Sequence, residues 1–417
     1  MDFYDLPRPQ LVPKNLICGK LYRILKKAFA AGTGESMRPE DIRRIRKRID
    51  TTLNNFRSIY GCYVNAAGEI VTTMEIPVLD MGSEEREMYA AILKKVLSGK
   101  AERNQISLEF PTEKVEDSDE HRLLMALRST QLRDGNMREL LYQRIIGSLD
   151  MDGESYVVIL AADTYDLRTK DVRDEEWSEE SNEQFEYFIC AICPVKTSKA
   201  ALQYLPGQQE FRGVSTGTLL APPSVGFIFP ALDEGSADIY QVQYYTKSTS
   251  VNHGELITAL FTIDNPPMAA DVQKETFNLT LAEALGKECS LDVVTSLQAK
   301  LSAKAEELHE ESPSEPAEIC IGDIEDILSD KGVSDDKIRS FGESVGERFD
   351  GAGTFNIGNL IQKRSFEVRT PETRIITDPE NALRIRTKTI DGVTYILVPA
   401  GESVSVNGVD ITIKPEE

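Results

Sequence analysis

The middle of the chain has the clearest alternation between apolar and polar stretches. Residues 156–162 and 185–193 are two short runs of β-branched, aromatic and small apolar side chains. Each run is bounded by turn-forming residues or by Pro194, which is typical of strands buried on both faces. Between them, residues 171–184 are dense in Asp and Glu. The pattern predicts two central strands that are joined by a solvated acidic loop.

Period-two patterns elsewhere predict more strands. Residues 60–65 and 69–74 form a hairpin pattern around Gly68, and further strand patterns cover 104–110, 225–229 and 239–245. Residues 202–223 are rich in Gly, Pro, Ser and Gln and are predicted to be a loop. These segments predict an antiparallel sheet of about four strands, covered by helices on one side.

Helical periodicity predicts helices before and after these strands. The predicted helices cover 83–97, 119–132, 136–149, 255–261, 269–285, 291–311, 322–330 and 335–348. Ser83, Ser290 and Ser334 stand at N-cap positions. The last 55 residues or so return to period two, with turn signals at 391–392 and 407–408, and predict small hairpins. The fold class is therefore α+β, with an antiparallel sheet covered by helices and a C-terminal module of a helix pair and β-hairpins.

The proline-containing stretch 310–316 is the clearest linker in the sequence. It divides the chain into a basic N-terminal extension (1–37), a main α+β domain (38–311) and a C-terminal helix-pair and β module (318–417).

Charge restricts the classes of partner. The chain of 417 residues has 47 basic and 69 acidic side chains, a net charge of −22, and should repel nucleic acid and anionic lipid at long range. It contains no apolar run long enough to span a membrane and no signal-peptide pattern at its start. Its six cysteines are scattered. We expect an ordinary cytoplasmic protein with reduced thiols and no integral membrane segment.

One segment has the opposite charge. From Lys14 to Arg57 there are 12 Lys and Arg against 4 Asp and Glu, a local charge of +8. A helix is predicted from Pro39 to about Asn54, with Ile42, Ile45 and Ile49 on its apolar face. Its cations are candidate contacts to a nucleic-acid backbone: Arg43, Arg44, Arg46, Lys47 and Arg48. Alternatively, the helix docks on the acidic loop 171–186 or has a solvated face. A further amphipathic helix at 16–30 could lie on a membrane surface.

Candidate catalytic groups are sparse. Asp163, Asp166 and Asp233 lie at or beyond strand ends, and His253 could join them as an acid–base group. Strand-end Asp residues more commonly cap turns. Cys190 and Cys193 form a C-x-x-C pattern, but a strand puts them on opposite faces and predicts two buried structural thiols. The sequence indicates no metal site and no cofactor.

Several segments resemble a family of uncharacterised proteins from anaerobic Gram-positive bacteria, the domain-of-unknown-function family 4317. The resemblance rests on 61–65 (Gly-Cys-Tyr-Val-Asn), 124–128 (Leu-Met-Ala-Leu-Arg), 190–196 (Cys-Ala-Ile-Cys-Pro-Val-Lys), 225–231 (Val-Gly-Phe-Ile-Phe-Pro-Ala) and 391–397 (Asp-Gly-Val-Thr-Tyr-Ile-Leu), and covers most of the chain from about residue 40. It implies no catalytic residue. A weaker similarity in the order of parts links the chain to the bacterial nucleoid-associated protein family.

Two functions follow as expectations. The first is a non-enzymatic cytoplasmic binding protein whose partner is nucleic acid, contacted by the basic helix, or another protein. The second is an enzyme whose carboxylate and histidine side chains meet at one edge of the central sheet.

Overall fold

The computed structural model describes residues 37–167 and 183–411, apart from short gaps at 112–114, 116–117, 206, 208, 215–216, 234–235, 314–315, 350–352, 363–364, 401–403 and 407. Within these residues an eight-stranded antiparallel sheet runs in the order β2-β1-β4-β5-β9-β12-β3, with β8 beside the end of β5. The strands are β1 Ser58–Val64, β2 Ile70–Pro77, β3 Gln105–Glu109, β4 Tyr156–Leu167, β5 Glu183–Thr197, β8 Thr218–Leu220, β9 Val225–Phe229 and β12 Gln241–Thr246. The predicted α+β class is confirmed.

The two central strands pair with each other along their whole length. Tyr156 lies opposite Pro194 and Leu167 opposite Glu183. Both strands are longer than predicted, and Pro194 lies inside β5 rather than ending it. Nearly every residue in their centre is buried because both faces of the sheet are covered.

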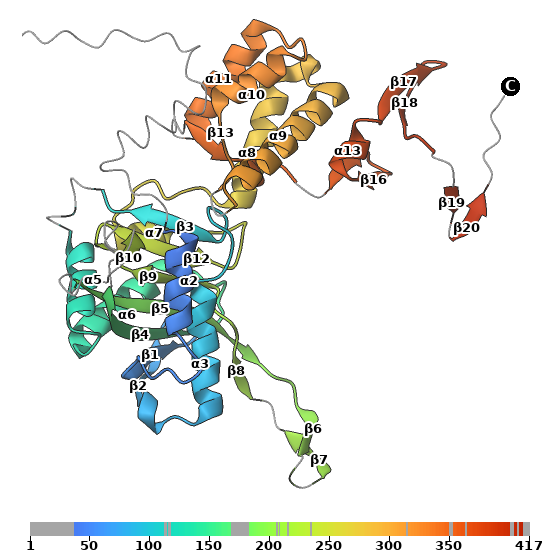
Figure 1. Cartoon of the computed structure of the whole chain (residues 1–417). Helices are drawn as coiled ribbons and strands as arrows, with labels where there is room; N and C mark the ends of the chain where they lie inside the picture. The colour runs from blue at the N-terminus through green and yellow to red at the C-terminus, as the bar shows by residue number, and fades with distance from the viewer. Residues whose placement is uncertain are drawn as a thin grey trace, which may run out of the picture.

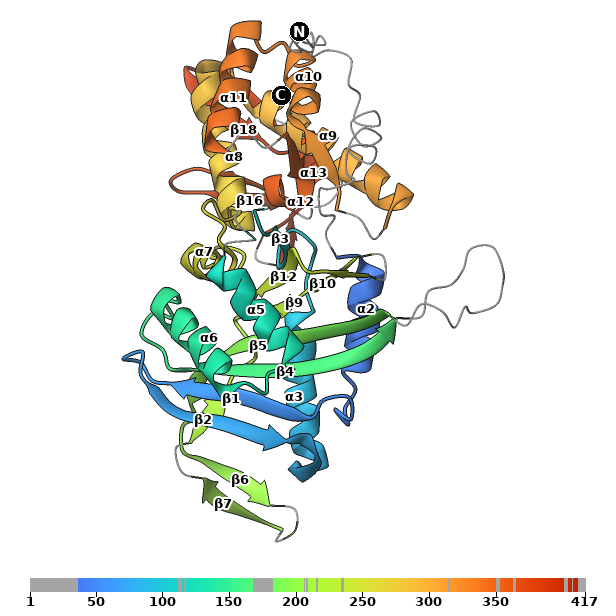
Figure 2. The ribbon, with the colours of Figure 1, turned by 90° about the vertical axis from the view of Figure 1, so that its left-hand side faces the viewer.

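Helices cover both faces, whereas the sequence predicted one covered face. Figure 2 shows α5 and α6 on one side of the sheet and α2 and α3 on the other. The first side also holds α7, and each side has its own apolar cluster. The bounds are α2 Pro39–Arg48, η2 Val78–Asp80, α3 Ser83–Val96, α5 Asp119–Ser129, α6 Gly135–Ser148 and α7 Gly254–Phe261. Ser83 is the first residue of α3 rather than its cap, because Gly82 precedes it there.

Residues 202–223, predicted as a loop, form strands instead. β6 Ala201–Leu205 and β7 Glu210–Val214 pair as a hairpin that protrudes from the body (Figure 1). Leu202, Tyr204 and Phe211 remain exposed on it. A second small hairpin, β10 Ala231–Asp233 and β11 Ser236–Asp238, lies between β9 and β12 in the chain. The composition of this stretch did not indicate the first hairpin, because its strands are short and bury little apolar surface.

A separate helical unit follows the sheet, and its apolar core crosses the predicted linker. The unit comprises α8 Ala270–Leu285, η3 Gly286–Glu288, α9 Leu291–Glu311, β13 Glu318–Cys320, α10 Ile321–Ser329, α11 Asp335–Arg348, β14 Thr354–Asn356 and α12 Ile357–Leu360. Phe277 of α8 and Leu301 of α9 share one cluster with Leu328 and Phe341. Helices 270–311 therefore pack with the segment that follows 316, and the apolar core does not divide at the predicted boundary.

The C-terminal hairpins extend beyond this unit (Figure 1). They are β15 Phe366–Arg369 with β16 Arg374–Thr377, β17 Arg386–Ile390 with β18 Val393–Leu397, and β19 Val404–Val406 with β20 Val409–Ile411; α13 Pro379–Ala382 follows β16. The last two hairpins turn at Gly392 and Gly408, each with a positive φ, as the turn signals predicted.

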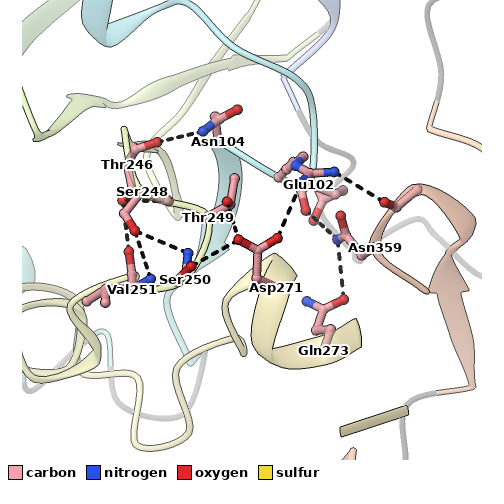
Figure 3. Close-up of polar contacts among 12 residues, drawn as sticks. Glu102, Asn104, Thr246, Ser248, Thr249, Ser250, Val251, Asp271, Gln273 and Asn359 are labelled. Atoms are coloured by element: carbon pink, nitrogen blue, oxygen red, sulfur yellow. Dashed lines mark hydrogen bonds and ion pairs between the residues drawn. The ribbon is translucent and has the colours of Figure 1, made fainter. Parts of the chain in front are cut away.

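A polar joint connects the sheet to the helical unit (Figure 3). Asp271, at the start of α8, accepts hydrogen bonds from Thr249 at 2.5 Å and Ser250 at 3.0 Å, and an Arg103 guanidinium nitrogen lies 3.3 Å away. Asn359 of α12 donates to the Glu102 carbonyl oxygen at 2.7 Å and is almost fully buried. The joint thus ties the loop before β3 to both ends of the helical unit.

Replacing Asn359 by Ala should lower the free energy of unfolding by about 1–3 kcal/mol, because it removes the hydrogen bond that the buried Asn359 side chain donates to the Glu102 carbonyl oxygen. Urea denaturation of the full chain measures this. Asn136→Ala, at an exposed position of α6, is the control and should change stability by less than about 0.5 kcal/mol. An equally small effect at Asn359 would show that the joint does not hold the two units together.

Candidate functional site: the basic helix and the adjoining cavity

Helix α2 forms where the sequence predicted a basic helix. Pro39 occupies its first turn with Glu40 and Asp41, and three cations occupy the last turn, which suits the helix dipole at both ends. Ile45 and Ile49 are fully buried against the sheet. The helix ends at Arg48, about six residues before the predicted end. Asp50 terminates it, since its carboxylate accepts the backbone N–H groups of Thr52 and Leu53 at 2.9 Å each.

Arg48 points to the sheet and binds Asp163. Its Nε donates to Asp163 Oδ2 at 2.8 Å and its Nη2 donates to Oδ1 at 3.0 Å, a bidentate pair. The carboxylate is only 2% exposed. The guanidinium carbon also lies 4.6 Å from the centre of the Tyr165 ring. One predicted nucleic-acid contact and one predicted catalytic carboxylate therefore neutralise each other.

Tyr187 completes this cluster. Its hydroxyl donates to Asp163 Oδ2 at 2.9 Å. Burial, and secondly the adjacent carboxylate, hold the pKa of Tyr187 well above its usual value. Burial lowers the pKa of Arg48, but the hydrogen bond and charge of Asp163 outweigh it and the net shift is upward. Tyr187 and Arg48 therefore keep fixed protonation states at neutral pH, which suits a structural cluster more than an acid–base catalyst.

The other four cations of α2 face outward. Arg44 lies 3.5 Å from the buried Asp41 carboxylate. Arg43, Arg46 and Lys47 are exposed and form no hydrogen bond or ion pair with any residue that the structure describes. At 100° per residue they fall within an arc of about 100°. We call these three residues the cationic stripe.

Of the remaining candidates, His253 is the one that the structure separates from Asp163. Asp233 ends β10, and the side chain of Asp166 lies outside the described residues. His253 precedes α7. Burial lowers its pKa, and the charges of Asp152 and Asp150 offset this only in part. Those two aspartates lie before the start of β4, and Asp163 lies seven residues along that strand, about 23 Å away. The structure therefore does not bring His253 and Asp163 together.

Cys190 and Cys193 are fully buried in β5 and belong to the clusters on opposite faces of the sheet. Burial raises the pKa of Cys193 to about 12 and that of Cys190 well above its usual value. Neither thiol is a reactive thiolate at neutral pH, so their predicted burial is confirmed.

Beside the Arg48–Asp163 pair, the structure has a cavity of about 290 Å³. It is lined by Arg57, Ser58, Tyr60, Arg133, Asp163 and Thr164, among others. These residues come from the start of β1, the loop between α5 and α6, and the end part of β4. No local pattern in the sequence predicted this cavity. The one residue that could have pointed to it is Arg57, the last cation of the basic segment, directly before the first strand.

Metal sites, membrane-spanning helices and the remaining predicted segments can be assessed only over the residues that the structure describes. Among the described residues, no group of three His, Cys, Asp or Glu side chains could hold a metal ion. In the same part of the chain, no helix combines the length and the apolarity that a membrane span requires. The predicted extension up to residue 36, with its 16–30 helix, and most of the acidic loop 171–186 lie outside the described residues.

Comparison with known proteins gives a family and no activity. No curated protein and no solved structure matches the chain. The layout similarity to the bacterial nucleoid-associated family receives no support from these comparisons. A family model described as a domain of unknown function (DUF4317) matches residues 37–409, which include the basic helix, the cavity and the helical unit. The chain therefore belongs to the DUF4317 family.

Proposed function

We propose that this protein is a non-enzymatic, cytoplasmic binding protein that contacts the phosphate backbone of nucleic acid through the cationic stripe. The observation that carries the proposal is the outward position of Arg43, Arg46 and Lys47 on one side of α2, without partners among the described residues. Arg48, by contrast, is turned to the sheet and paired with Asp163.

The rest of the helix supports this arrangement. Ile45 and Ile49 are buried and Arg48 is bound to Asp163, so α2 is held on the sheet in one orientation. A held helix presents its cations without first having to fold. Because phosphate contacts carry no base information, the binding should tolerate any sequence. The net charge of −22 opposes binding at long range, and the few phosphate contacts weaken as salt is added, so we expect measurable binding at low salt only.

The enzyme alternative has no comparable support. Asp163 is occupied by Arg48 and Tyr187, and His253 lies at the other end of the sheet.

Reversing the stripe with Arg43→Glu, Arg46→Glu and Lys47→Glu together should lower affinity for duplex DNA at least tenfold at about 50 mM salt. The matched control carries Lys95→Glu, Lys304→Glu and Arg339→Glu, which lie at scattered exposed positions. Each replacement changes the charge by −2, so both triples shift the net charge from −22 to −28. Fluorescence anisotropy with a labelled duplex measures both.

The control should retain most of the wild-type affinity, because it changes the long-range field equally but not the stripe. Equal losses in the two triples would mean that net charge alone governs binding. Absence of binding by the folded wild-type protein at low salt would end the nucleic-acid proposal.

A further inference from the structure

The cavity beside α2 has a charge that differs from that of the whole protein. Arg57 and Arg133 line it. Arg57 has no side-chain partner among the described residues, and Arg133 uses its Nε to donate to the Thr130 carbonyl oxygen at 3.0 Å. The only carboxylate in the lining, that of Asp163, is neutralised by Arg48. With Arg48 counted against Asp163, the cavity and this ion pair together have a net charge of +2 in a chain with a net charge of −22.

Side chains with hydroxyl groups accompany these cations. Ser58 and Tyr60 are 5% and 3% exposed, and both line the cavity. Neither hydroxyl has a hydrogen-bond partner among the residues that the structure describes, nor does that of Thr164. The hydroxyl oxygens themselves are not among the buried polar atoms without a partner, so they keep contact with solvent and can bond a molecule in the cavity.

The backbone at the cavity wall is held in an unusual conformation. Gln131 and Leu132 both have positive φ, at 51° and 59°. Neither residue is Gly, Asn or Asp, so each conformation costs free energy. Leu132 is fully buried, and its N–H donates to the Leu127 carbonyl oxygen at 2.9 Å. This turn fixes the position of Arg133, the next residue.

We infer that the cavity binds the phosphate group of a small phosphate monoester, with Arg57 and Arg133 as its counter-charges and the Ser58, Tyr60 and Thr164 hydroxyls as further donors. A phosphate monoester has a charge of about −2 near neutral pH and three acceptor oxygens, which match two guanidinium groups and several hydroxyls. A carboxylate has one negative charge and would leave one arginine uncompensated. The volume, about 290 Å³, is at the lower end for small-molecule sites.

This site is distinct from the cationic stripe, and an internal phosphodiester, with one negative charge, does not match it. The inference thus goes beyond nucleic-acid binding and can fail or hold independently of it.

The test titrates the full chain with glycerol 3-phosphate, and with glycerate as a carboxylate of similar size and one charge less, by isothermal titration calorimetry. We expect saturable binding of glycerol 3-phosphate and at least tenfold weaker binding of glycerate. Arg57→Gln and Arg133→Gln should each weaken glycerol 3-phosphate binding about tenfold or more, since each removes charge-assisted hydrogen bonds. Both side chains are exposed, so the variants should melt near the wild-type temperature.

Arg43→Gln with Arg46→Gln is the matched control, because it removes two arginines from the stripe and leaves the cavity unchanged. It should retain glycerol 3-phosphate binding and weaken DNA binding, and the Arg57→Gln/Arg133→Gln pair should do the reverse. The inference is overturned if wild type does not bind glycerol 3-phosphate, if glycerate binds equally well, or if the cavity variants bind as wild type does.

Discussion

Replacing Arg48 by Met should lower the free energy of unfolding by about 3–5 kcal/mol, because it leaves the Asp163 carboxylate buried without its cation. Asp163 is only 2% exposed, and among the described residues its other side-chain hydrogen-bond partner is the Tyr187 hydroxyl. Methionine keeps an apolar stem beside Tyr165, so the loss reports mainly on the charge. Urea denaturation with fitted midpoints and slopes measures it.

Two further variants make this result specific. Arg43→Met removes a cation from the exposed side of the same helix and should change stability by less than about 0.5 kcal/mol. Arg48→Met combined with Asp163→Leu removes both charges and should recover most of the loss, because the desolvation cost of the carboxylate disappears with it. If Arg48→Met were as mild as Arg43→Met, the pair would not anchor α2.

Replacing Gly226 by Ala should cost about 2–3 kcal/mol, near the upper part of the range for overpacked cores. Gly226 lies in the central strand β9, opposite Ala191 of β5. A Cβ there would lie 2.6 Å from the Cys190 carbonyl oxygen and 2.8 Å from a Val96 methyl carbon of α3. The carbonyl belongs to a neighbouring strand and cannot move without disturbing the sheet. Thermal or urea unfolding of the variant measures the loss.

Gly147→Ala is the matched control for Gly226→Ala. Gly147 is in α6, and a Cβ there would meet no atom within 4 Å. Alanine should therefore raise stability by about 0.5–1 kcal/mol through helix propensity. If Gly226→Ala were instead as stable as wild type or more stable, α3 would not pack on the sheet at this point.

Local patterns predicted the elements that bury much apolar surface. The strand at 225–229 and the helix at 291–311 were predicted within a residue or two, and Ser290 caps the latter with a hydrogen bond to Val293 N–H at 3.3 Å. The hairpin of β6 and β7 was missed, since it has little burial to leave a pattern. The core shared across 310–316 was also missed, because a proline-rich composition marks a turn but does not say which helices pack across it.

The contacts at the candidate site join segments that are distant in the sequence, and local patterns could not predict them. Sequence reasoning found both Arg48 and Asp163, but assigned them to rival functions. They are separated by 115 residues, and only the pairing of β1 with β4 brings the end of α2 close to Asp163. The cavity is likewise made from three distant segments, so no local motif could have shown that Arg57 and Arg133 line the same space.

The most direct test of the account is the salt dependence of DNA binding by the unmodified protein. If only Arg43, Arg46 and Lys47 contact phosphates, log affinity against log salt concentration should have a slope of about −2.7, from roughly −0.9 per contact on duplex DNA. A slope near −4.5 would mean that all five cations of α2 take part, which contradicts the assignment of Arg48 to the sheet. No binding at low salt would contradict the proposed function itself.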